Sequence, residues 1–378
     1  MKKILFLAQL IPNKMGTMEE FVLLLSQELK KRGHKCHLGF AAMPPDNIKQ
    51  LFHTTDAIIH ITNVSEKTLI KKLKVAYNLF KIIKDNDIDV VHTNFFGLTA
   101  IPMLGIYLGR AKIVFTDHSS GKTYAKPWLR NNLAKALHFF IKLRTFKYIA
   151  VSNFVKKRMK ETHYVNEEQC ITIYNGINIE RFKRTNKIDS RLVTEGNKNQ
   201  HTLLAVASHI PEKGLQILIK AISLLKEKSA DVHINAMFVG DGWYSMELEK
   251  LVLERNVSKE IQFLGRRSDV HTLIEKADIV VVPSLWDEAF GLIVAEAMAS
   301  GTPVIASRIG GIPELIENDV SGYLFEPGNA EELALKIINL LNDRQKQIEL
   351  SAAALEKVKM QFDIYDQIKA IIKIYESA

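Results

Sequence analysis

Two successive runs of alternating apolar and amphipathic segments constrain the fold of this chain more than any other feature. In the first run, apolar stretches such as KILFLAQL (3–10), DVVHTNF (89–95), KIVFTDHS (112–119) and YIAVS (148–152) accompany helical patterns such as MEEFVLLLSQELKKRG (18–33). The order strand, helix, strand is typical of a parallel sheet with helices on both faces. We therefore predict an α/β fold.

The alternation restarts after residue 200, in TLLAVAS, GLQILIKAISLLKEK, INAMFVGDG, IQFLG, DIVVVPS, PVIAS and GYLFEP. The intervening segment TNKIDSRLVTEGNKNQ is polar, patternless and rich in turn residues, as linkers are. A chain of 378 residues is also too long for one ordinary core. We predict an N-terminal domain over 1–185, a linker over 186–200, a C-terminal domain over 201–360, and a last helix over 361–378 that packs back on the N-terminal domain.

The composition, with 47% hydrophobic and 25% charged residues, is that of a soluble globular protein. Cys36 and Cys170 are the only cysteines, and two thiols so far apart form neither a disulfide framework nor a metal cluster, which favours a reducing cytoplasm. The opening MKKILFLAQLIPNK runs into a turn without a small-residue cleavage site, so we expect a first strand there instead of a signal peptide. No window approaches the roughly 18 apolar residues of a membrane span.

The net charge of +9 is unevenly distributed, with +16 over residues 1–190 and −7 over residues 191–378. Residues 117–161 contain eleven Lys or Arg between their terminal acids, interleaved with aromatic residues. Such a stretch fits an anionic membrane surface or an acidic acceptor, because each cation near anionic lipid contributes about 1 kcal/mol. A solvated helix face explains it equally well, since apolar residues from 129 to 140 already form a core-facing stripe. No nucleic-acid recognition motif accompanies the charge, so we expect no nucleic-acid partner.

Two glutamates stand in the apolar stretch DEAFGLIVAEAMASGTPVIAS, residues 287–307. Between Gly291 and Ser300 every residue except Glu296 is apolar or small, so this acid has little polar helix face on which to be solvated, and we expect a specific partner for it. On one helix, Glu288 and Glu296 would lie about 12 Å apart along the axis. That exceeds the roughly 5–9.5 Å between the paired acids of a glycosidase. Two separate parts of one long ligand fit this spacing better.

A nucleotide sugar has such a layout, with a ribose, a diphosphate and a hexose. Carboxylates accept hydrogen bonds from pairs of hydroxyls, which suits the ribose and the hexose. The backbone N–H groups of Phe290, Gly291 and Leu292 at the helix start can face the phosphate between them.

Two further turns carry weaker signals. In SHIPEKGLQILIKA, Lys213 stands at a helix start, where the dipole disfavours a cation by roughly 0.3–1 kcal/mol, so a bound anion is expected beside it. An exposed lysine is the alternative. In PNKMGTMEE, Gly16 lets backbone approach a ligand and Thr17 can cap a helix together with Glu20, although turn geometry alone also explains the glycine.

Taken together, these segments resemble the retaining glycosyltransferase family 4, which has the GT-B fold of two Rossmann-like doubly wound domains facing across a cleft. The family signature of two glutamates with seven residues between them reads EAFGLIVAE here. PEKG, FVGDG, FLGRRSDV, ADIVVVPS and NDVSGYLFEPGN match in the C-terminal half, and DVVHTNF, FTDHS, AVSNFVKKRM and YNGINIERF match in the N-terminal half. The resemblance covers nearly the whole chain.

The resemblance implies that the C-terminal domain binds the nucleotide sugar and the N-terminal domain binds the acceptor. Glu296 would bind the nucleotide ribose, Glu288 the hydroxyls of the donor sugar, and Lys213 the diphosphate. The remaining donor contacts would come from the backbone of Phe290, Gly291 and Leu292, and from the backbone near Arg267, which would meet the base.

In the N-terminal domain, the resemblance matches His118 to a histidine beside the reacting sugar, and Gly16 to a loop near the diphosphate and acceptor. A strand-end histidine bonded to backbone is the alternative for His118. The expected catalytic residues are thus His118, Lys213 and Glu288.

Two positions depart from the family pattern. The family has an arginine five residues before the lysine, where this chain has Ser208. Arg266, Arg267 and His209 are the candidates to replace it. In the first-domain loop, Met15 precedes Gly16 where the family commonly has paired glycines.

We therefore expect a retaining glycosyltransferase that moves a hexose or N-acetylhexosamine from a nucleoside-diphosphate sugar, with UDP preferred over GDP, to a hydroxyl of a glycan or glycolipid. The expected setting is bacterial cell-envelope polysaccharide or lipopolysaccharide synthesis in the cytoplasm, with possible peripheral association with the inner membrane. No cofactor and no metal are expected. The alternatives are a nucleotide-sugar-binding accessory protein without turnover, and a sugar phosphorylase or epimerase with the same fold.

Overall fold

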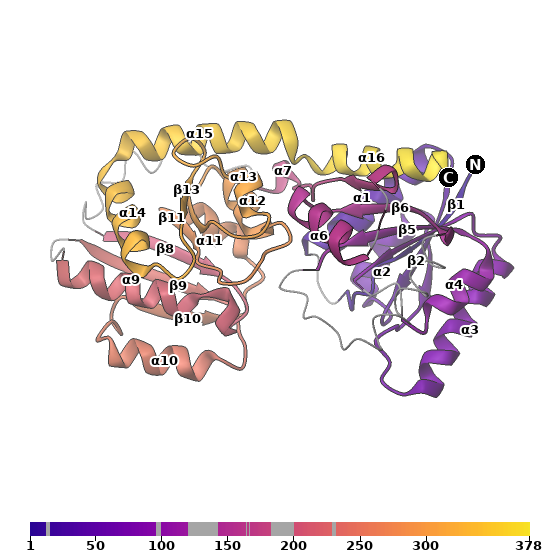
Figure 1. Ribbon diagram of the computed structural model, residues 1–378, viewed down its shortest axis with the longest axis horizontal. Helices are drawn as coiled ribbons and strands as arrows, with labels where there is room; N and C mark the ends of the chain where they lie inside the picture. Colours follow the sequence, from indigo (N-terminus) through magenta and orange to yellow (C-terminus); the bar gives the residue numbers. More distant parts are fainter. Residues whose placement is uncertain are drawn as a thin grey trace. The chain divides into compact units, whose positions relative to one another are not determined.

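The computed structural model describes residues 1–12, 16–95, 100–119, 143–163, 165, 167–182, 200–228 and 232–378 (Figure 1). These residues form two compact units. The first contains the described residues up to Tyr174 together with Ile364–Ala378, and the second contains those from Asn175 to Asp363.

Within its described residues, the first unit has a sheet of seven parallel strands in the order β3-β2-β1-β4-β5-β6-β7. The strands are β1 (Lys3–Leu7), β2 (Lys35–Phe40), β3 (Ile58–Ile61), β4 (Val90–Asn94), β5 (Lys112–Asp117), β6 (Thr145–Ala150) and β7 (Cys170–Thr172). The helices are α1 (Thr17–Lys31), α2 (Asp46–His53), α3 (Leu69–Asp85), α4 (Met103–Gly109), α6 (Asn153–His163), the short 3-10 helix η1 (Glu167–Gln169) and α16 (Ile364–Ser377).

Both faces of this sheet are covered. On β1, Ile4 and Phe6 point to one face and Leu5 and Leu7 to the other, and all four side chains are fully buried. Right-handed crossovers place α1 and α2 on one face and α3 and α4 on the other. Figure 1 shows α16 beside α1, away from α3 and α4, and α16 shares the core cluster of β1 and α1. The last helix therefore belongs to the first unit.

The second unit has a sheet of six parallel strands among its described residues, in the order β10-β9-β8-β11-β12-β13. The strands are β8 (Gln200–Val206), β9 (His233–Val239), β10 (Ile261–Gly265), β11 (Ile279–Val282), β12 (Val304–Ser307) and β13 (Tyr323–Phe325). The helices are α7 (Ile179–Phe182), the 3-10 helix η2 (Pro211–Lys213), α9 (Leu215–Lys228), α10 (Ser245–Glu254), α11 (Val270–Lys276), α12 (Leu292–Ala299), α13 (Ile312–Leu315), α14 (Ala330–Asn342) and α15 (Arg344–Gln361).

The predicted α/β class with two doubly wound parallel sheets is confirmed. The predicted segment IQFLG coincides with β10, every other apolar segment predicted as a strand overlaps one, and GLQILIKAISLLKEK contains the helix α9. Strands β2, β3 and β7 were not singled out from the sequence. At four residues with two exposed positions, β3 lacks the continuous apolar run that marks the central strands.

The boundary between the units falls between Tyr174 and Asn175, instead of after residue 185. Ile177 forms a parallel bridge with Asp363, and α7 contacts α11 and α12, which assigns this segment to the second unit. Most of the predicted linker, residues 186–199, lies outside the described residues, as do residues 120–142 of the basic stretch. No helix among the described residues is long and apolar enough to span a membrane.

A buried histidine attaches α16 to the sheet of the first unit. His92 on β4 is 1% exposed; its Nδ1 lies 2.5 Å from the Tyr375 hydroxyl and its Nε2 lies 2.6 Å from Thr116 Oγ1. Burial lowers the pKa of His92 from 6.5 to about 3, because the imidazolium would lose its hydration. The neutral ring is therefore part of the folded state.

We predict that acid destabilises the protein partly through His92. Because its folded-state pKa is below its unfolded-state value, its contribution is complete above about pH 6.5 and is lost as the pH falls toward 3. One such group changes the free energy of unfolding by at most about 1.4 kcal/mol per pH unit. Urea unfolding from pH 7 to 4 should give a shallower slope for His92→Gln than for the parent or for the exposed-site control His233→Gln. Equal slopes would contradict this assignment.

Candidate functional site

The candidate site lies at the carboxyl ends of β8 and β11 in the second unit. These two strands are neighbours, and the chain continues from β8 toward one edge of the sheet and from β11 toward the other. Open α/β sheets bind ligands at such a switch point, because the loops after the two strands diverge and leave room between them.

Backbone contacts hold these two loops together. Gly214, with φ of 70°, follows η2, and a Cβ on it would lie 1.8 Å from the carbonyl oxygen of Pro283. Leu285 N donates to Glu212 O at 2.8 Å. The close approach requires glycine at 214, and it fixes Lys213 opposite the loop after β11.

Lys213, Ser284 and Glu288 form the polar centre of the site. Lys213 Nζ and Ser284 Oγ each donate to Glu288 Oε1, both at 2.7 Å. Ser284 is 1% exposed, and the side chains of Lys213 and Glu288 are 27% and 14% exposed. The anion expected beside Lys213 is therefore, in the protein alone, the carboxylate of Glu288.

This triad, defined as Lys213, Ser284 and Glu288, has hydrogen-bonding groups that its internal contacts do not use. An ammonium has three donors, of which Lys213 gives one to Glu288. Among the described residues, Glu288 Oε2 receives no hydrogen bond. The triad can thus offer donors to an anion such as phosphate and an acceptor to a hydroxyl.

The backbone of Glu288 is positioned by two glycines. Gly311 N donates to Glu288 O at 2.7 Å. Gly310 has φ of 59°, and a Cβ on it would lie 2.3 Å from Glu288 O and 2.5 Å from Glu288 N. Any larger residue at 310 would displace the peptide that carries the carboxylate.

Glu288 and Glu296 do not lie on one helix. Helix α12 begins at Leu292, and Gly291, its N-cap, has φ of 103°, which breaks the helical path before it. Glu288 lies on the preceding loop, so the 12 Å axial separation does not apply. Glu296 lies in the second turn of α12 and is half-buried.

The residues at the start of α12 differ in exposure. Phe290 is 2% exposed, and its ring packs edge-on against Phe362 at 5.6 Å, so only its backbone is a candidate for ligand contact. Leu292 is 39% exposed.

Ser208, which stands where the family has an arginine, is exposed. Among the described residues, none of the three candidates to replace that arginine forms a hydrogen bond or ion pair with the triad. Arg266 pairs with Asp241 at 3.6 Å. Arg267 makes two hydrogen bonds to Asp269, at 2.8 and 2.7 Å.

His209 is buried, and its Nδ1 lies 2.8 Å from Ser245 Oγ. Burial lowers the pKa of His209, which disfavours a cationic role for it.

In the first unit, His118 lies just after β5. Its Nε2 is 3.1 Å from Asn94 Oδ1, so its partner is a side chain. The alternative of a strand-end histidine predicted a backbone partner. The His118 ring stacks on Phe95 at 4.4 Å with 17° between the planes. Desolvation lowers the pKa of His118 to about 4, so the ring is neutral at pH 7. Because the amide oxygen accepts, Nε2 is protonated and Nδ1 is an acceptor.

Asn94 connects His118 to the switch point of the first unit, where β1 and β4 are neighbours. Asn94 is 2% exposed, and its Nδ2 is buried without a hydrogen-bond partner among the described residues. Phe95 has φ of 61° and is 49% exposed. A strained aromatic beside an unsatisfied amide is typical of a binding surface.

Gly16 is the N-cap of α1, and the predicted cap by Thr17 with Glu20 is wrong. Gly16 N donates to Glu19 Oε2 at 3.1 Å, so the carboxylate three residues after the cap closes the helix start. Met15 lies outside the described residues.

Ser284, Gly310 and Asn94 were not predicted as site residues. Ser284 and Asn94 each stand at the end of a buried strand beside a switch point, and that position was the available signal. Gly310 is 22 residues after Glu288, and no sequence pattern indicates that the two backbones touch.

Comparison with known proteins agrees with this architecture. The model of Glycosyltransferase Family 4 matches residues 18–181, and the model of Glycosyl transferases group 1 matches residues 186–357. An uncharacterized glycosyltransferase of Methanocaldococcus jannaschii is 31% identical over 334 residues, which cover 85% of each chain.

Two further relatives extend the comparison. The UDP-Gal:alpha-D-GlcNAc-diphosphoundecaprenol alpha-1,3-galactosyltransferase of Escherichia coli is 26% identical over 82% of this chain and 80% of its own. The crystal structure of a glycosyltransferase from Rickettsia africae superposes with a TM-score of 0.81 at 25% identity, covering 100% of this chain and 98% of that chain. The chain therefore belongs to glycosyltransferase family 4 and has the GT-B fold.

Proposed function

We propose that this glycosyltransferase moves a hexose or N-acetylhexosamine from a nucleoside-diphosphate sugar to a hydroxyl of a glycan or glycolipid, with retention at the anomeric carbon. The observation that carries the proposal is the triad at the switch point of the second unit, where a lysine and a carboxylate are already paired. These are the two groups that a diphosphate and a sugar hydroxyl require.

Donor binding would replace one anion by another at Lys213. The diphosphate takes hydrogen bonds from the Lys213 ammonium in place of Glu288 Oε1. Ser284 still donates to the carboxylate and keeps it in place, and Glu288 then accepts hydrogen bonds from hydroxyls of the sugar. Exchange of a carboxylate for a phosphate conserves charge pairing, so Lys213 is not left as an unpaired, partly buried cation.

In the transfer step, the bond between the anomeric carbon and the diphosphate oxygen breaks while the acceptor oxygen attacks from the same face. The proton of the acceptor hydroxyl goes to the departing phosphate, and a nucleoside diphosphate leaves. Negative charge grows on that phosphate, and Lys213 with the amides of 290–292 stabilises it. Preorganised donors of this kind contribute roughly 3–4 kcal/mol each to transition-state stabilisation. We assign no metal and no cofactor to this step.

The other predicted residues take supporting roles in the proposal. Glu296 binds the ribose, and the backbone near Arg267 binds the base. In the first unit, neutral His118 is the candidate for a hydrogen bond to a substrate hydroxyl through Nδ1, and the Gly16 loop is the candidate for backbone contact.

Relatives support the choice of substrates. The name of the Escherichia coli relative specifies a UDP-sugar donor and a diphosphoundecaprenol-linked acceptor. We therefore favour UDP over GDP and an envelope glycan or glycolipid acceptor, handled in the cytoplasm near the inner membrane.

The direct test is release of nucleoside diphosphate from a panel of nucleotide sugars with candidate acceptors. Glu288→Gln keeps the size of the side chain but removes its charge, and it should lower kcat/KM by about 10²-fold or more. Glu260→Gln is the matched control, because Glu260 also forms a partly buried ion pair, with Lys226 at 2.9 Å. A chelator should leave the rate unchanged.

Three results would overturn the proposal. Thermal stabilisation by a nucleotide sugar without release under any acceptor would indicate an accessory binding protein, the alternative motivated by Ser208. Dependence on inorganic phosphate would indicate a phosphorylase, and product formed without an acceptor would indicate an epimerase. Inhibition by the chelator would show that the transfer step requires a metal ion.

A second prediction concerns Gly310, whose backbone touches Glu288. Gly310→Ala should weaken donor binding by about tenfold or more, because the new Cβ displaces the Glu288 peptide. Gly301→Ala is the control, since Gly301 has a similar φ of 63° and open space around it. Both variants bear a left-handed strain of about 1–2 kcal/mol. Equal donor affinity in the two variants, measured by calorimetry, would show that the position of Glu288 does not matter.

A further inference from the structure

Helix α3 of the first unit is apolar on two sides. Ala76, Leu79 and Ile83 are buried on its inner side. Ile70, Leu73 and Tyr77 recur at the same helical spacing but are 72%, 48% and 66% exposed. An ordinary surface helix has only the first of these two faces.

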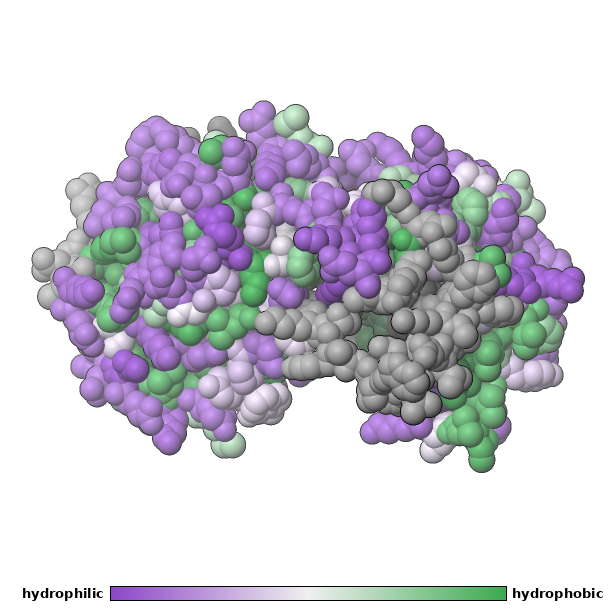
Figure 2. Space-filling model, viewed as in Figure 1, coloured by the Kyte–Doolittle hydropathy of each residue, from purple (hydrophilic) through white to green (hydrophobic). Residues whose placement is uncertain are grey.

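Helix α4 extends this exposed surface. A Cβ on Gly105 would lie 1.8 Å from the carbonyl oxygen of Ala76, so α3 and α4 are in backbone contact. Leu104 and Leu108, one turn apart on α4, are 47% and 67% exposed. Figure 2 shows apolar side chains gathered over the part of the first unit where Figure 1 places α3 and α4.

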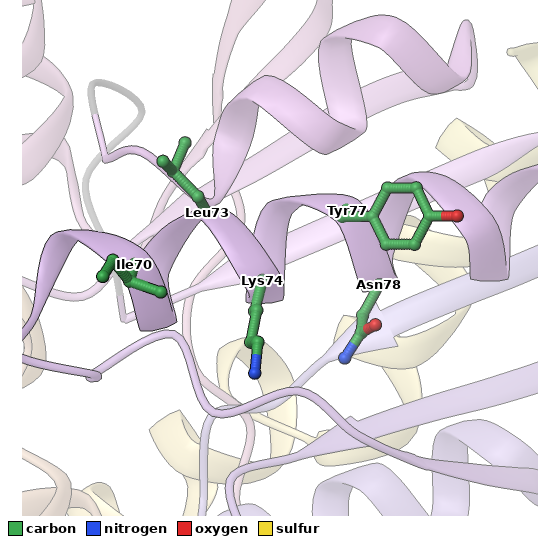
Figure 3. A pocket seen from close by; sticks show the side chains of 5 residues that line it. All are labelled: Ile70, Leu73, Lys74, Tyr77 and Asn78. Atoms are coloured by element: carbon green, nitrogen blue, oxygen red, sulfur yellow. The ribbon is translucent and has the colours of Figure 1, made fainter.

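The outer side of α3 is also hollowed and basic. Ile70, Leu73, Lys74, Tyr77 and Asn78 line an open hollow of about 500 Å³. Figure 3 shows Ile70, Lys74 and Asn78 following one another along the same side of the helix. The 17 residues of α3 contain five lysines, at 71, 72, 74, 81 and 84, and their single acid is the terminal Asp85.

We infer that the exposed face of α3 and α4 is a docking surface for an anionic lipid bilayer. A helix that lies in a membrane interface presents apolar side chains to the acyl boundary and lysines to the headgroups. Lysine stems cover apolar surface while their ammonium groups reach phosphate. Tyr77 suits the same interface, because its ring is apolar and its hydroxyl is polar. α3 would lie in the plane of the interface.

Charge argues against a second copy of this chain as the occupant. A twofold contact through this face would bring the exposed Lys71, Lys74, Lys81 and Lys84 of both copies together, and like charges repel. A surface of phosphate headgroups neutralises them instead. This inference goes beyond the proposed transfer reaction. Because its test measures lipid binding and not transfer, the inference and the proposed function can be refuted independently.

The experiment is flotation with vesicles of phosphatidylcholine alone, and of phosphatidylcholine with about one-third phosphatidylglycerol. We expect binding to the anionic vesicles, weakened by salt. Two double variants test the surface: Ile70→Ser with Tyr77→Ser, and Lys71→Glu with Lys74→Glu. Each should weaken binding by about tenfold or more. The matched control is Leu253→Ser with Lys250→Glu on α10, where Leu253 is 67% exposed, and it should bind like the parent.

Because the substituted side chains are exposed, the variants should keep the parent circular dichroism spectrum and melting temperature. Absence of binding to anionic vesicles by the parent would overturn the inference, as would binding that the α3 variants do not change. Light scattering that shows a parent dimer and monomeric α3 variants would also overturn it, because a second copy would then cover this face.

Discussion

The ion pair between Lys213 and Glu288 is the interaction on which the proposed donor site depends. The cation comes from the turn after β8 and the carboxylate from the loop after β11, and these strands meet at the switch point of the second sheet. Ser284, almost fully buried, donates to the same carboxylate oxygen and fixes its position. The pair keeps both charges compensated before any ligand arrives, which is what a partly buried site requires.

Glycines make this arrangement possible where a side chain would prevent it. Gly214 allows backbone contact between the two loops, and Gly310, in the turn after β12, lies against the Glu288 peptide. The switch point of the first unit is built differently. There, Asn94 is hydrogen-bonded to a neutral His118 and Phe95 stacks on its ring. One unit therefore offers charge, and the other offers neutral hydrogen-bonding and stacking groups.

The sequence predicted the parallel sheets well, because buried strands such as β10 and β11 are short continuous apolar runs. It predicted Lys213 and Glu288 as site residues, but not that they pair, since 75 residues separate them and only the strand order makes them neighbours. The helix start was placed at Phe290 instead of Leu292, because the left-handed φ of Gly291, which is the N-cap, cannot be read from the sequence. Gly310 was missed for a similar reason, as its role depends on a backbone contact across two loops. The exposed face of α3 was also missed, because its apolar spacing is that of a core helix.

A crystal structure of the protein with a non-transferable nucleotide-sugar analogue tests the central claim most directly. The account predicts that Lys213 Nζ contacts the diphosphate, that Ser284 still donates to Glu288, and that the carboxylate accepts hydrogen bonds from hydroxyls of the sugar. An analogue bound elsewhere, with Lys213 Nζ still 2.7 Å from Glu288 Oε1, would contradict it.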